Sequence, residues 1–154
     1  MIDLPMRAFC LMGNDGKNKI ELTIDEVFWP PELSSDLIEF TGGYEFKGTL
    51  MIHVGSYKVH NNNFFSRAKE LCCLYNSLVK CYSSLEGMTK YTHMYDEDLE
   101  IEIKMTRYGH AIIDGKYTEY PHLPNTLTFQ IETDQSCIRC AIDDLGRVER
   151  LLNK

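Results

Sequence analysis

The sequence predicts a single α+β domain, in which an antiparallel β-sheet packs against two amphipathic α-helices. Three observations support this prediction. Apolar and polar residues alternate with a period of two through much of the first 65 residues and again between residues 99 and 131. Helical spacing appears after residue 66 and again near the C-terminus. The connections between neighbouring strands are short enough for antiparallel pairing, and the 154 residues match one ordinary domain, 1–154.

The N-terminal part is predicted to form strands. Ile20, Leu22 and Ile24 alternate with polar residues, as in a half-buried strand. This pattern breaks at residues 28–31, Phe-Trp-Pro-Pro, because proline cannot donate to a sheet ladder. Residues 37–40 resume an extended pattern. Residues 44–59 predict a hairpin with its turn near residues 55–56.

The first helix is predicted to follow a turn at residues 61–63, Asn-Asn-Asn, with Ser66 as its N-cap. Gly87 is expected to terminate it. The helix shows an apolar stripe at spacings of three and four, made by Leu71, Leu74, Tyr75, Leu78, Val79, Tyr82 and Leu85.

The C-terminal half predicts further strands and a closing helix. Residues 99–105 alternate strictly, and residues 127–131 mark a last strand. Asp114-Gly115 predicts a two-residue hairpin turn, which would place His110 opposite Glu119. Thr133-Asp134 is expected to cap the last helix, in which Gly146 is a weak point. That helix is built on Ile138, Ala141, Ile142, Leu145, Val148 and Leu152.

The charge distribution suggests a basic partner. The formal net charge is −7, and residues 21–45 hold seven acids and no Lys or Arg. The rest of the chain balances, since 23 − 7 leaves 16 acids against 16 bases. An acidic surface repels phosphate and attracts basic proteins, so direct nucleic-acid binding is not expected.

The compartment is expected to be the cytoplasm. The first residues lack a basic region followed by an apolar run, so no signal peptide is predicted. No stretch approaches the ~18 apolar residues that a membrane span needs. The six cysteines are therefore expected to be thiols.

No cofactor, metal site or enzymatic activity is predicted. Cys137-Ile-Arg-Cys140 is a C-x-x-C, but no second ligand pair accompanies it, so Cys137 is interpreted as a small core residue beside the apolar stripe. The five histidines show no metal-ligand spacing. A hydrolase that pairs Cys10 with a histidine in space stays open as an alternative.

The binding surface is predicted around the acidic segment. Phe28 and Trp29 are candidate aromatic anchors beside the two prolines, and the surrounding acids form a candidate rim. The predicted partner-binding residues are Asp25, Glu26, Phe28, Trp29, Glu32, Asp36, Glu39 and Glu45.

Two stretches carry a family resemblance. Residues 43–50, Gly-Tyr-Glu-Phe-Lys-Gly-Thr-Leu, open a hairpin, and residues 129–135, Phe-Gln-Ile-Glu-Thr-Asp-Gln, lead into the closing helix. With the helix at 71–85, these resemble the WapI family of bacterial immunity proteins. They are more loosely similar to immunity proteins of contact-dependent growth inhibition systems. The resemblance covers roughly residues 42 to 152.

The resemblance implies a small cytoplasmic protein that binds the C-terminal domain of a polymorphic toxin, often a nuclease with a basic surface. An acidic inhibitor suits such a toxin, since complementary fields speed association. Two points stay open. One is an alternative function as a small-ligand or sensor domain, whose sheet would hold an apolar molecule beneath the first helix. The other is homodimerisation through exposed strand edges.

Overall fold

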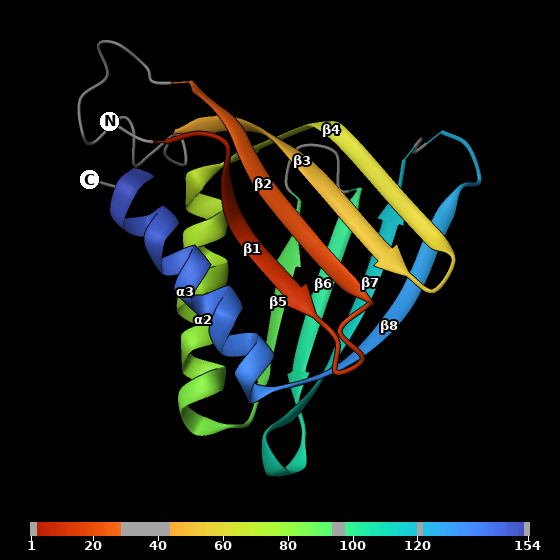
Figure 1. The fold of residues 1–154 in the computed structure, drawn as a ribbon, viewed down its shortest axis with the longest axis vertical. Helices are drawn as coiled ribbons and strands as arrows, with labels where there is room; N and C mark the ends of the chain where they lie inside the picture. The colour runs from red at the N-terminus through yellow and green to blue at the C-terminus, as the bar shows by residue number, and fades with distance from the viewer. Residues whose placement is uncertain (1–2, 29–43, 94–97, 120–121, 153–154) are drawn as a thin grey trace.

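The computed structural model describes residues 3–28, 44–93, 98–119 and 122–152 (Figure 1). These residues form two four-stranded antiparallel sheets and two long helices. Strand order is β1-β2-β3-β4 in the first sheet and β5-β6-β7-β8 in the second, so sequential strands are neighbours. The predicted α+β class is confirmed, but the strands divide into two sheets where one was expected.

The first sheet contains β1 (Met6–Met12), β2 (Lys19–Phe28), β3 (Glu45–Val54) and β4 (Tyr57–Arg67). The predicted alternation in β2 is confirmed, because Ile20, Leu22 and Ile24 are fully buried. β3 and β4 form the predicted hairpin, and Gly55 in its turn has a φ of 59°, which glycine adopts without strain. The extended segment expected at 37–40 lies outside the described residues.

The turn predicted at residues 61–63 is wrong, because these asparagines lie inside β4. Asn61 pairs with Leu50 of β3, and a register shift between Gly48 and Leu50 accommodates one extra residue as a β-bulge. Phe64, which follows, is buried in the core. Pairing with β3 and burial of Phe64 therefore override the local turn preference of asparagine.

Helix α2 (Ala68–Ser84) begins later than predicted, and Ser66 is not its cap. Ser66 is a buried residue of β4 whose hydroxyl donates to the Glu70 carboxylate. The N-cap residue is Arg67, which makes no side-chain capping bond. At the other end Leu85 takes the left-handed conformation, with φ 54°, so the helix ends before Gly87. The predicted buried stripe is confirmed for Leu71, Leu74 and Leu78.

The second sheet contains β5 (Met88–Thr92), β6 (Leu99–Met105), β7 (His110–Thr118) and β8 (Thr126–Asp134). A short 3₁₀ turn, η1 (Arg107–Gly109), joins β6 to β7. The alternating strand at 99–105 and the last strand are confirmed. β5 was not predicted, because five residues give too short a run to show a period.

The hairpin turn predicted at Asp114-Gly115 is wrong, because β7 runs straight through both residues. Asp114 pairs with Glu102 of β6 on one side and with Gln130 of β8 on the other. Gly115 serves packing: an added Cβ would lie 2.1 Å from the Phe129 ring. The predicted pairing of His110 with Glu119 is therefore also wrong, and His110 pairs with Asp134.

Helix α3 (Gln135–Leu152) has the predicted cap. The Asp134 carboxylate accepts hydrogen bonds from the backbone N–H groups of Ser136 at 2.9 Å and Cys137 at 3.2 Å. Thr133 is buried instead, and its hydroxyl donates to the Met12 carbonyl at 2.6 Å. The predicted apolar face is confirmed for Ile138, Ala141, Ile142, Leu145 and Val148.

The two helices lie side by side, and α3 runs along the edge strand β1 (Figure 1). Gly146, expected to weaken α3, is buried where the two helices meet. A Cβ added at this position would lie 3.3 Å from the Tyr75 ring of α2, so the glycine allows the helices to approach closely. Arg7 of β1 and Asp144 of α3 form an ion pair at 2.8 Å. Strands from both sheets and both helices contribute to one buried cluster. None of the described helices is long and apolar enough to cross a membrane.

Candidate functional site

Cys10, the candidate nucleophile, is poorly suited to reactive chemistry. All six cysteines are free thiols, and Cys10 is buried in β1. Burial and, to a smaller extent, the nearby Glu21 carboxylate raise the pKa of Cys10 to about 11. A nucleophilic cysteine needs a lowered pKa. The C-x-x-C places Cys137 half-buried and Cys140 exposed. Within the described ranges, no group of three or more His, Cys, Asp or Glu side chains could hold a metal ion.

His93 is the buried histidine that the sequence did not single out. Its Nδ1 lies 2.5 Å from the Asp98 carboxylate, and its Nε2 lies 2.5 Å from the Phe65 carbonyl. Because both partners can accept hydrogen bonds, this geometry favours a ring that carries a proton on each nitrogen. Burial opposes this charge, but the bonds to Asp98 and Phe65 outweigh it and raise the pKa of His93 above its usual value. The buried ring therefore ties the end of β5 to β4.

The outer face of the first sheet carries an exposed aromatic pair. Phe28 at the end of β2 and Phe65 in β4 are 43% and 47% exposed. Their rings stack across β3 with centroids 6.5 Å apart and planes 16° apart. Phe65 was missed by the sequence reasoning. The signal was the dipeptide Phe64-Phe65, since successive strand residues point to opposite faces and a buried Phe64 sends Phe65 outward.

Acidic residues surround this pair, but bases accompany them. Glu26 is exposed and pairs across the sheet with Lys47, and Glu45 forms an ion pair with Arg67 at 3.3 Å. The Asp25 carboxylate accepts a hydrogen bond from the Thr49 hydroxyl at 2.7 Å. The structure thus brings four predicted binding residues to one end of this face, namely Asp25, Glu26, Phe28 and Glu45. The others, Trp29, Glu32, Asp36 and Glu39, lie outside the described residues.

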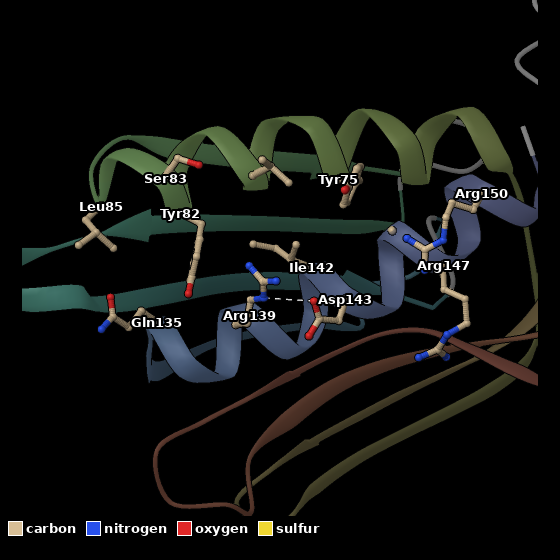
Figure 2. A pocket seen from close by; sticks show the side chains of 12 residues that line it. Tyr75, Tyr82, Ser83, Leu85, Gln135, Arg139, Ile142, Asp143, Arg147 and Arg150 are labelled. Atoms are coloured by element: carbon tan, nitrogen blue, oxygen red, sulfur yellow. Dashed lines mark ion pairs between the residues drawn. The ribbon is translucent and has the colours of Figure 1, made fainter.

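A second surface feature is a groove of about 680 Å³ between the two helices, called here the α2–α3 groove (Figure 2). Arg139 and Arg150 of α3 lie along one side, and Tyr75 and Tyr82 reach in from α2. Arg147 also lines the groove, but its guanidinium points away from α2 (Figure 2). The complete lining is Tyr75, Val79, Tyr82, Ser83, Leu85, Gln135, Arg139, Ile142, Asp143, Gly146, Arg147 and Arg150.

This groove differs from the pocket that a small-ligand domain would need. That alternative placed an apolar molecule beneath the first helix, between helix and sheet. The groove lies between the helices, and its lining includes three arginines. It therefore suits a polar, anionic partner better than an apolar molecule.

The family model described as the immunity protein WapI-like family matches residues 10–152. The match therefore begins 32 residues before position 42, where the resemblance in the sequence begins, and it includes the end of β1 and all of β2. No curated protein matches the chain.

Proposed function

The chain belongs to the WapI-like immunity protein family, and on that basis we propose that it binds the C-terminal domain of a bacterial toxin and neutralises it by contact. The observation that carries the proposal is the extent of the family match, which runs from β1 into the last turn of α3. A match over nearly all the described elements concerns the whole fold, not a single motif.

The chemistry of the toxin follows from the charge of the chain. We propose a basic domain, such as a nuclease whose surface holds phosphate. An acidic inhibitor of net charge −7 would be attracted to it across solvent and would not compete for nucleic acid itself. Such an inhibitor would act in the cytoplasm of toxin-producing sister cells, in a contact-dependent or polymorphic toxin system. The six free thiols are consistent with that reducing compartment.

The contact surface we propose is the end of the first sheet that carries the aromatic pair. Phe28 and Phe65 are large, exposed and held in place by stacking on each other, as suits an interface anchor. Asp25, Glu26 and Glu45 stand beside them. The predicted residues Trp29, Glu32, Asp36 and Glu39 follow β2 directly in the sequence and complete the proposed surface.

Titration against the C-terminal domain of the toxin encoded beside this protein tests the proposal. We expect nanomolar binding, loss of toxic activity at one equivalent, and weaker binding as salt rises. No binding and no inhibition would overturn the immunity function and bring the small-ligand alternative forward.

Paired variants test the surface separately. Phe28→Ala should weaken binding about 30-fold, the scale of an interface hot spot. Leu123→Ala removes another exposed apolar side chain elsewhere and should have little effect. Reversal of Glu32, Asp36 and Glu39 to Lys should slow association. A charge-matched control, reversal of exposed Glu86, Glu119 and Glu132 to Lys, should slow it less. If each test variant changes toxin binding no more than its control does, the interface lies elsewhere.

A further inference from the structure

The α2–α3 groove has a linear row of charge along one wall. Arg139, Asp143, Arg147 and Arg150 follow one another at spacings of four, four and three, so they share one face of α3. At 1.5 Å per residue the row extends roughly 17 Å. Ile142 of α3 lies between this wall and α2 (Figure 2), and Val79 of α2 is a further apolar lining residue. The groove is therefore long, basic on one side and apolar at its floor.

The charge of this groove is opposite to that of the chain. Three arginines and one aspartate line it, which gives +3 − 1 = +2 in a protein of net charge −7. Arg139 pairs with Asp143 at 3.1 Å, and Arg147 lies 3.6 Å from Asp144. Arg150 makes no ion pair with any described residue. The Arg150 end of the groove is thus the more available to a carboxylate.

The opposite end of the groove holds an exposed apolar side chain beside polar ones. Leu85, which lines it, is 42% exposed. Gln135, another lining residue, lies against Gly109 of the β6–β7 turn, where Tyr108 is 93% exposed in a left-handed conformation with φ 60°. An exposed aromatic residue in a strained conformation is uncommon and suits a contact site.

The groove also connects to the outer face of the first sheet. Asp144 is buried between two arginines: Arg7 of β1, at 2.8 Å, and Arg147 of the groove, at 3.6 Å. Arg7 pairs with Thr23 of β2, so the two surfaces adjoin along the edge strand β1. One large partner could therefore contact both.

We propose that the α2–α3 groove is a second contact surface for the toxin, and that it holds an acidic amphipathic segment of that protein. Carboxylates of the segment would bind Arg147 and Arg150, and its apolar side chains would pack on Val79, Ile142 and Leu85. Helical segments bind grooves in this way through one apolar stripe. This inference rests on the proposed function. It adds that the toxin presents acidic as well as basic surface.

The test compares two charge-matched variants in the same toxin titration. Arg147→Glu/Arg150→Glu reverses the groove, and Lys80→Glu/Lys116→Glu reverses two exposed bases outside it. Both variants have a net charge of −7 − 4 = −11. The groove variant should bind roughly 10- to 100-fold more weakly than the control, because charge-assisted hydrogen bonds from arginine are lost. Arg150→Glu alone, which breaks no ion pair with a described residue, should give part of this loss with an unchanged thermal midpoint.

The outcomes are distinguishable. If the wild type binds the toxin and the groove variant binds as tightly as the control, the groove inference is overturned and the immunity function stands. If the wild type does not bind, both are overturned. Sedimentation of the chain alone tests whether a second copy of the chain fills the groove instead. A dimer that the Arg150→Glu substitution dissociates would assign the groove to that second copy and overturn the proposal.

Discussion

Substitution of Gly115 by alanine tests whether packing against Phe129 explains this glycine. An alanine Cβ would lie 2.1, 2.4 and 2.7 Å from three atoms of the Phe129 ring. Carbon atoms prefer about 3.5–4.0 Å, so the ring would have to retreat by roughly 1.5 Å. Such overpacking lowers the free energy of unfolding by about 1–3 kcal/mol. The better strand propensity of alanine raises it by about 0.5–1 kcal/mol. We expect a net loss of about 1–2 kcal/mol.

Urea unfolding measures this loss, and a thermal midpoint lower by about 2–8 °C should accompany it. The control is the same substitution in a Phe129→Leu background, because leucine lacks the three ring atoms in conflict. There Gly115→Ala should cost nothing or stabilise slightly, giving a coupling energy of about 1–2 kcal/mol. If Gly115→Ala costs the same in both backgrounds, the Phe129 ring does not explain the glycine.

Three further measurements test other parts of the structure. The raised pKa of His93 means that the stability it contributes is complete below about pH 6.5 and is lost as pH rises through the higher folded-state value. The urea midpoint of the wild type should therefore fall more steeply between about pH 6 and pH 9 than that of His93→Gln, and equal slopes would contradict a buried imidazolium. Asp134→Ala should cost about 0.5–2 kcal/mol at neutral pH through loss of the N-cap. Because hydrogen bonds from Ser136 and the Cys137 N–H lower the pKa of Asp134, this cost should shrink as pH falls through that lowered value, and an unchanged midpoint at pH 7 would argue against the cap. Cys10, with its pKa raised to about 11, should react with a thiol reagent at pH 8 far more slowly than exposed Cys73, and similar rates would contradict its burial.

The parts of the fold that the sequence predicted are those set by local periodicity. The alternation in β2 and β6 and the stripe on α3 each repeat over seven residues or more, and burial follows them. The cap at Asp134 was also predictable, because capping needs only the next few backbone N–H groups.

The errors came from residues whose state depends on distant partners. Asp114-Gly115 has the composition of a hairpin turn, but two neighbouring strands and the Phe129 ring hold it in a sheet. The asparagines at 61–63 are held in β4 by pairing with β3. The sequence gives no sign that His93 is buried and hydrogen-bonded, because Asp98 and Phe65 contact it only in the folded chain. Local preference could not reveal these contacts.

The same distinction applies to the charge of the proposed toxin-binding surface. Counted along the chain, residues 21–45 contain seven acids and no base. Counted on the folded sheet, Glu26 faces Lys47, Glu45 pairs with Arg67, and Lys19 lies 3.7 Å from Glu21. Nearby bases cancel much of the field of these acids beyond a Debye length of about 8 Å. The attraction of a basic toxin from a distance should therefore depend more on Glu32, Asp36 and Glu39, which no base accompanies in sequence, while Phe28 and Phe65 act after contact.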